Sequence, residues 1–201
     1  MATAYPEYDD EPTGERVLRI ATELFAERGF DATGVQELSD ATGLGRGALY
    51  YHIKSKQHVL QRITITLLQR AIESAEDIVA RDLPVPDRLA LLTNYLITDL
   101  MTSRPAWITA MRDWSSLDDE ARAQVLVLRD RYESIWQQLL DEGAALGVTR
   151  PVDPVLRKAI IGMFTSMHNW LEPQGALSAE EISTTYLDFL LHGLRRHPDR
   201  R

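Results

Sequence analysis

Cationic, phenolic and imidazole side chains gather in one short stretch of the chain, between positions 46 and 56. They are Arg46, Tyr50, Tyr51, His52, Lys54 and Lys56. Groups of these types donate hydrogen bonds to phosphate oxygens and to the edges of bases. The chemistry that this stretch could perform is therefore binding of a nucleic acid.

The charge pattern around this stretch favours a contact with DNA. Residues 41–72 contain five basic residues and no Asp or Glu, whereas the whole chain has a formal net charge of −8, so the remainder carries −13. One basic face on an acidic protein permits local contact with a phosphate backbone that repels the rest. The alternative is a loop between two ordinary core helices whose charges are merely solvated.

Two short helices must position these side chains. Apolar residues recur at helical spacing over 35–42, and a second short helix is predicted from Arg46 to about His52. Gly43 and Gly45 break the chain between them, because glycine takes positive φ without penalty. Two short helices joined by a glycine-containing turn are the plan of a helix-turn-helix.

The rest of the chain has the periodicity of helices, without a strand pattern or an internal repeat. Further helices are predicted over about 14–28, 55–80, 87–103, 105–114, 118–146, 154–171 and from 179 onward. The predicted helix-capping residues are Thr13, Thr33, Ser55, Asp153 and Ser178. The expected fold class is all-α.

What the sequence lacks argues against several functions. There is no cysteine, which excludes disulfides and thiolate catalysis. No histidine has a metal-binding spacing, and no P-loop, GxSxG or dinucleotide fingerprint occurs, so we expect no enzyme activity, cofactor or metal. Residues 1–12 are acidic, unlike a signal peptide, and 159–171 is too short to cross a bilayer, so a cytoplasmic protein is expected.

A family resemblance adds to these expectations. The run RVLRIATELFAERGFDATGVQELSDATGLGRGALYYHIKSKQHVL, residues 16–60, resembles the DNA-binding domain of the TetR family of bacterial repressors, most specifically in LFAERGFDAT and TGLGRGALYYHIKSK. The acidic, proline-containing residues 1–12 are expected to form a disordered arm. The resemblance implies that a three-helix helix-turn-helix domain follows over 13–56. A helix over 55–80 would link it to a six-helix ligand-binding and dimerisation domain over 57–201.

The resemblance also assigns residues to DNA. They are Thr33, Gln36, Arg46, Gly47, Ala48, Tyr50, Tyr51, His52 and Lys56. By analogy, Thr33 and Lys56 would hold phosphates, and Arg46 would line the groove side of the recognition helix. The sequence departs from the family where Gly45 and Ala48 replace common hydroxyl residues, so base preference cannot be transferred from a relative.

Aromatic and methionine side chains in the C-terminal part gather where the family keeps a ligand cavity. The candidate ligand-binding residues are Tyr95, Trp107, Met111, Trp114, Arg129, Tyr132, Trp136, Phe164 and Trp170; the alternative for each is an ordinary core position, or for Arg129 a surface one. The run NWLEPQGALSAEEISTTYLDFLLHGL resembles the last two helices of family members that regulate lipid and steroid breakdown, several of which sense CoA thioesters. The expected effector is apolar or acyl-CoA-like, with a drug-like or other small hydrophobic molecule as the alternative.

The last two predicted helices are apolar on more than one face, which favours a two-fold interface over burial inside a monomer. Its candidate residues are Gly162, Met163, Met167, Tyr186, Phe189 and Gly193. We therefore predict a repressor that binds a palindromic double-stranded DNA operator as a homodimer and is released by its effector. A dimeric scaffold without DNA affinity is the alternative.

Overall fold

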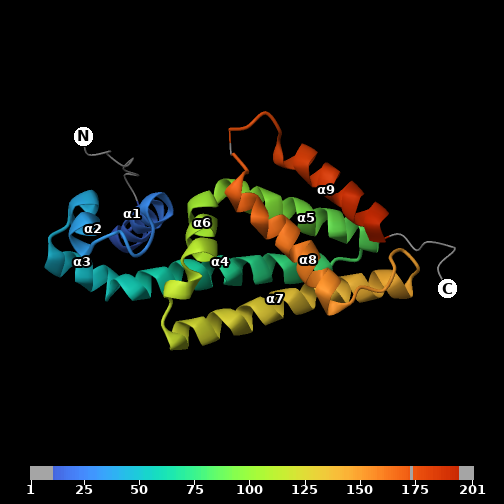
Figure 1. The fold of residues 1–201 in the computed structure, drawn as a ribbon, viewed down its shortest axis with the longest axis horizontal. Helices are drawn as coiled ribbons and strands as arrows, with labels where there is room; N and C mark the ends of the chain where they lie inside the picture. The colour runs from blue at the N-terminus through green and yellow to red at the C-terminus, as the bar shows by residue number, and fades with distance from the viewer. Residues whose placement is uncertain (1–10, 173, 195–201) are drawn as a thin grey trace. The chain divides into compact units, whose positions relative to one another are not determined.

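The computed structural model describes residues 11–172 and 174–194, and this part of the chain is helical apart from turns and short connections (Figure 1). The helices in chain order are α1 (Thr13–Arg28), α2 (Val35–Thr42), α3 (Arg46–Ile53), α4 (Lys56–Val79), α5 (Val85–Thr102), α6 (Arg104–Arg112), the 3-10 turn η1 (Trp114–Ser116), α7 (Asp119–Ala145), α8 (Pro154–Thr165), the 3-10 turn η2 (Ser166–Asn169) and α9 (Ala179–Leu194). The all-α prediction is confirmed. The predicted N-terminal arm falls almost wholly outside the described residues.

The chain forms two compact units, each made of two segments that are separated in the sequence. The first runs to Leu67 and includes Pro105–Leu126, and the second comprises Leu68–Arg104 and the chain from Val127 onward. The chain therefore passes between the units inside α4, at the start of α6 and inside α7. This division differs from the predicted boundary after residue 56, because half of α4 and all but the first residue of α6 belong to the same unit as α1–α3.

The first unit holds α2 and α3 against α1 through a small apolar core. Phe25 of α1 and Leu49 of α3 are fully buried, and each contributes about 1.5–3 kcal/mol relative to an exposed position. At the end of α1, Gly29 has φ +96° and donates its N–H to the carbonyl of Phe25. This turn brings Phe30 onto Phe25 with the ring centroids 5.3 Å apart, so the direction of the chain into α2 is fixed by packing.

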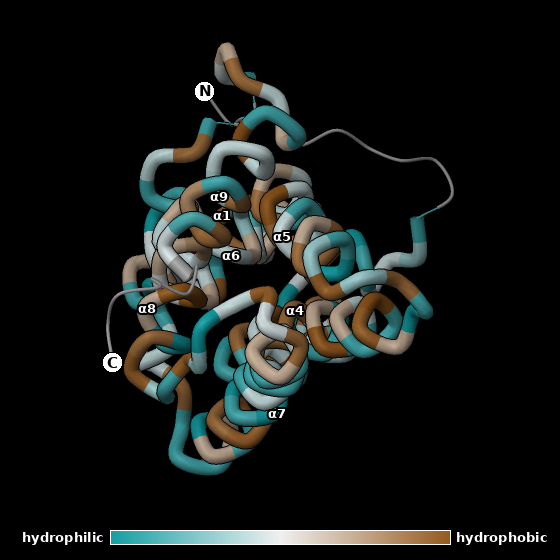
Figure 2. Tube along the Cα trace, turned by 90° about the vertical axis from the view of Figure 1, so that its right-hand side faces the viewer, coloured by the Kyte–Doolittle hydropathy of each residue, from teal (hydrophilic) through white to brown (hydrophobic). Residues whose placement is uncertain are grey.

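The second unit is built on α5 and α9, which lie side by side (Figure 1). Along these helices hydrophobic residues alternate with hydrophilic ones, as Figure 2 shows by colour. The apolar face of α5 is completely buried through Leu89, Leu92 and Leu96, and Phe164 of α8 is equally buried. These buried faces leave one side of α8 and α9 exposed, as described below. No helix of the described chain is long and apolar enough to cross a membrane.

The predicted helix caps have mixed outcomes. Asp153 and Ser178 cap α8 and α9 as predicted, since their side chains accept the N–H groups of Leu156 and Glu181 at 2.8 and 3.2 Å. Ser55 likewise accepts the N–H of His58. The prediction for Thr13 is wrong. Thr13 is the first residue of α1, which begins one residue earlier than predicted, and Pro12 is the N-cap.

Replacing Ser178 with alanine is expected to destabilise the start of α9 by about 1 kcal/mol. The N–H and hydroxyl of Ser178 also donate to the Glu181 carboxylate and hold its pKa below the usual value. A lowered folded pKa gives stability that is present above the unfolded pKa and is lost as pH falls through the folded value. The difference in unfolding temperature between wild type and S178A should therefore shrink below about pH 4; a constant difference would contradict the role of Glu181.

Candidate functional site

The exposed face of α3 is the candidate DNA-reading surface. Leu49 and Ile53 bury the opposite face of this short helix. Tyr51 is 83% exposed and Tyr50 is 45% exposed, so large aromatic groups project into solvent rather than into the core. The predicted DNA residues that the structure leaves exposed together are Gln36, Arg46, Gly47, Ala48, Tyr50 and Tyr51, with His52 half-buried beside them.

A chain of side-chain hydrogen bonds joins α2 to the start of α3. Arg46 donates from Nε to Oε1 of Gln36 at 3.2 Å, and Gln36 donates from Nε2 to Asp40 at 2.8 Å. The Asp40 carboxylate therefore orients the Gln36 amide, and the amide oxygen holds the arginine. Sequence reasoning missed Asp40, although its spacing of four residues from Gln36 on a helix is a recognisable signal.

The structure corrects the role predicted for Thr33. Its side chain is completely buried, and its hydroxyl donates to the carbonyl of Gly29 at 2.8 Å. A buried, bonded hydroxyl cannot reach a phosphate. The helix cap predicted for Thr33 is also wrong, because Gly34 occupies the N-cap of α2.

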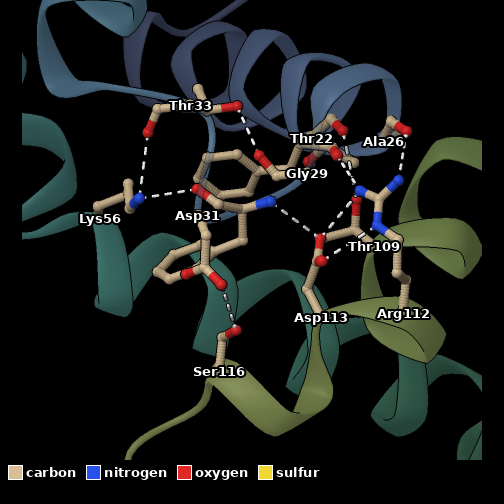
Figure 3. Close-up of polar contacts among 12 residues, drawn as sticks. Thr22, Ala26, Gly29, Asp31, Thr33, Lys56, Thr109, Arg112, Asp113 and Ser116 are labelled. Carbon is tan, nitrogen blue, oxygen red and sulfur yellow. Dashed lines mark hydrogen bonds and ion pairs between the residues drawn. The ribbon is translucent and has the colours of Figure 1, made fainter.

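Lys56 likewise has a structural role. Its ammonium donates to the carbonyls of Phe30 and Thr33 at 2.7 and 3.1 Å (Figure 3). It also lies 4.1 Å from the centre of the Phe30 ring, which adds a cation–π contact. Two of its three N–H donors are therefore occupied, so Lys56 mainly ties α4 to the turn before α2 and is not the freely available phosphate contact that was predicted.

The end of α6 is joined to the end of α1 by Arg112 (Figure 3). The guanidinium donates to the carbonyls of Phe25 and Ala26, the second at 3.0 Å. Carbonyls in the last turn of a helix carry partial negative charge, so a cation is favourable there, even at Phe25, whose carbonyl also accepts the N–H of Gly29. Arg112 therefore caps the C-terminal end of α1 within the first unit.

Asp113 completes this connection. Its carboxylate accepts both Arg112 Nε and Nη2 at 3.0 Å and also the backbone N–H of Phe30 at 3.2 Å. Asp113 is 8% exposed, and its partner Phe30 is 83 residues away in the chain. We define Arg112, Asp113 and the backbone groups that they bind as the α1–α6 clamp. No local sequence signal marks Asp113.

Three of the predicted ligand-binding residues meet in the second unit. Trp136 lies between Tyr132, at 6.5 Å between ring centroids, and Phe164, at 5.7 Å. Phe164 in turn contacts the Tyr186 ring at 5.4 Å. All but Tyr186 are buried. We call these four residues the aromatic cluster.

The remaining predicted ligand-binding residues lie elsewhere. Trp107, Met111 and Trp114 belong to the first compact unit, whereas the aromatic cluster belongs to the second. In the second unit, Tyr95 donates its hydroxyl to the carbonyl of Arg70 at 3.2 Å, and Arg129 is half-buried on α7. Trp170 is 51% exposed, so it is not a core residue of that unit.

The face formed by α8 and α9 carries a groove of about 370 Å³. Its lining residues are Arg150, Leu156, Ala159, Ile160, Met163, Phe189, Leu190 and Gly193. Phe189 is 66% exposed, and a Cβ added at Gly162 or Gly193 would meet no atom of the described chain within 4 Å. Met167, predicted to lie at an interface, is instead fully buried within the protomer, because the chain turns into η2 before that position.

Two segments of the chain match family profiles of known proteins. Residues 17–63 match the profile described as bacterial regulatory proteins, tetR family, and residues 82–194 match that described as tetracyclin repressor-like, C-terminal domain. The HTH-type transcriptional repressor KstR2 of Mycolicibacterium smegmatis is 28% identical over 198 residues, covering 94% of this chain and 95% of that protein.

Solved structures of TetR family regulators are also similar to this chain. The TetR family transcriptional regulator PfmR of Thermus thermophilus is 33% identical, with a TM-score of 0.83 over 90% of this chain and 100% of that chain. AibR, solved in complex with isovaleryl coenzyme A and operator DNA, has a TM-score of 0.76 over 91% of this chain and 98% of its own. Its identity of 22% makes it evidence of the fold alone.

Proposed function

Because this chain belongs to the TetR family of bacterial transcriptional regulators, we propose that it is a repressor that binds a palindromic operator as a homodimer and is released by an apolar, acyl-CoA-like effector. The observation that carries the DNA-binding half is the exposed face of α3. An exposed arginine-and-tyrosine face, inside the acid-free window 41–72, is what phosphate and base contacts require.

The residues of this face have different roles in the proposal. Arg46 reads bases from the major groove, with Gln36 beside it, because guanidinium and amide groups can pair with base edges. Ala48 fits the methyl group of thymine, and Gly47 admits the close approach of the backbone. Tyr51 lines the groove side beside Arg46 and Ala48, and Tyr50 and His52 hold phosphates. Neither Thr33 nor Lys56 is a principal contact, because their polar groups already bond to the protein.

A second copy of the chain is the proposed occupant of the α8–α9 face. The support is a phenylalanine that is 66% exposed, with two open glycines that let helices approach closely. Two α3 helices in such a dimer would enter successive major grooves about 34–36 Å apart, which requires a palindromic operator.

The effector half of the proposal draws on the second unit and on a relative. The aromatic cluster offers an apolar environment, and AibR has been solved with isovaleryl coenzyme A. An acyl-CoA-like effector that binds the released form more tightly than the operator-bound form would shift the population towards release. A drug-like or other small hydrophobic effector is the second candidate, favoured by the same apolar surroundings.

The test measures, by fluorescence anisotropy, the binding of the purified protein to DNA from upstream of its own coding region. The measurement is made with and without acyl-CoAs of graded chain length. We expect one tight site, weakened by at least one acyl-CoA. R46A should lose about tenfold or more and change the preferred bases, whereas Y50A should weaken all sequences alike. Tight binding that no acyl-CoA or small hydrophobic compound changes would contradict the effector half, and absence of any site would contradict the whole proposal.

A further inference from the structure

Two buried hydrogen-bond donors of the aromatic cluster meet no acceptor among residues 11–172 and 174–194. Tyr132 and Trp136 lie one turn apart on α7 and are 5% and 0% exposed. Neither the Tyr132 hydroxyl nor the Trp136 indole nitrogen makes a hydrogen bond within the described part of the chain. Buried polar groups are almost always bonded, because an unsatisfied donor loses its bonds to water without compensation. An acceptor supplied from outside the protein would satisfy both groups, which lie on the same helix, unlike the isolated hydroxyl of Thr93.

The donor character of the pair is fixed. Burial raises the pKa of the Tyr132 hydroxyl, against a smaller opposing effect of the neighbouring Trp136 N–H, so the hydroxyl keeps its proton at neutral pH. The indole N–H can only donate. The two rings lie 6.5 Å apart between centroids on α7. A single oxygen or two neighbouring oxygens placed between them could accept from both groups.

The surroundings select an uncharged acceptor on an apolar part of the ligand. Phe164 packs at 5.7 Å from Trp136, so a ligand beside this pair meets hydrocarbon and ring surface. The Asp99 carboxylate is near enough to disfavour negative charge at Tyr132, and it is itself paired with Arg70 at 2.7 Å. A carboxylate on the ligand would therefore be repelled, and a cation would find donors where it needs acceptors.

We propose that Tyr132 and Trp136 donate hydrogen bonds to a carbonyl oxygen of the effector, which makes the effector a compound with an uncharged carbonyl group, either an acyl thioester or a ketone. This inference rests on the proposed function, because it assigns a polar anchor to the effector of the same regulator. The carbonyl is the chemistry shared by both sources. It gives specificity that apolar contacts alone do not give, because a buried donor left unpaired penalises any analogue without the oxygen.

The test compares ligands that differ in one oxygen. Octanoyl-CoA is paired with its thioether analogue octyl-CoA, and the fused-ring ketone 2-decalone is paired with decalin. Binding to the full-length wild type, Y132F and W136F is measured by calorimetry. We expect the wild type to bind the carbonyl member of one pair about tenfold or more tightly than its partner, and the preference to fall to near unity in Y132F. Which pair shows the preference identifies the source of the carbonyl.

T93V is the matched control, because Thr93 on α5 is also fully buried with an unpartnered hydroxyl. It should keep the carbonyl preference. Free Y132F should be no less stable than wild type, since it removes an unsatisfied group. Equal wild-type binding of both members of each pair, or a preference that survives in Y132F and W136F, would overturn the inference while leaving effector-driven release of operator intact. Binding of none of the four ligands, with no operator release by any acyl-CoA or small hydrophobic compound, would overturn the effector half of the proposed function and this inference with it.

Discussion

Replacing Phe189 with glutamate is expected to convert the protein to a monomer and to weaken operator binding by about 10²-fold or more. Phe189 is 66% exposed at the groove between α8 and α9, where the proposed second copy would bury it. The change removes the apolar contact of the ring and places a charge that must be desolvated on association, which opposes association strongly. A monomer also loses the effective concentration that linking two half-site contacts provides, which is worth about 10²–10⁴ in affinity.

The measurements are the molar mass by analytical ultracentrifugation and the operator affinity by anisotropy. L146E is the matched control, because Leu146 near the end of α7 is also 66% exposed but does not line the groove. It should leave both the mass and the affinity unchanged. A dimeric F189E protein with normal affinity would show that the copies associate through another face.

Replacing Asp113 with alanine is expected to lower the free energy of unfolding of the first unit, which contains α1–α3, by about 2–3 kcal/mol. The change leaves the buried N–H of Phe30 without an acceptor and removes the carboxylate that accepts from Nε and Nη2 of Arg112. Because the clamp fixes the end of α1 and the chain leading into α2, operator affinity should fall as well. Urea unfolding gives the stability, and hydrogen exchange locates the loss.

Two controls separate the bonds of Asp113 from its charge. D113N keeps an acceptor oxygen for Phe30 and should cost less, about 1 kcal/mol. D31A removes a nearby carboxylate that has only a 3.4 Å contact with Ser116 and should cost under about 0.5 kcal/mol. If D113A unfolds at the same urea concentration as D31A, the clamp does not stabilise this unit.

Features that depend on neighbouring residues were predictable from sequence. The caps Asp153 and Ser178 were confirmed, because the groups that they bind lie three residues away. The ends of α3 were predicted to within a residue. Gly43 takes φ +69° and ends α2, so the break before α3 falls at the glycine-containing turn, as predicted. Local residue type decides both features.

Features that depend on distant partners were not predictable. Thr33 has the residue type of a helix cap or a phosphate contact, but packing directs its hydroxyl to Gly29. Asp113 has no distinctive neighbours in sequence. Its partner, the backbone N–H of Phe30 in the turn after α1, is known only from the fold. Trp107 and Trp114 lie on predicted helices, as Tyr132 does, but helical spacing alone does not tell which compact unit a residue joins.

The interrupted course of the first unit limits how this protein can be recombined. A chimera that takes only the N-terminal residues, up to the middle of α4, would leave behind Pro105–Leu126 and with them both side chains of the clamp. The transplanted head would then expose the carbonyls at the end of α1 and lose the acceptor for Phe30. A functional graft must carry two separate segments, so α6 and the DNA-reading helices are expected to be inherited together.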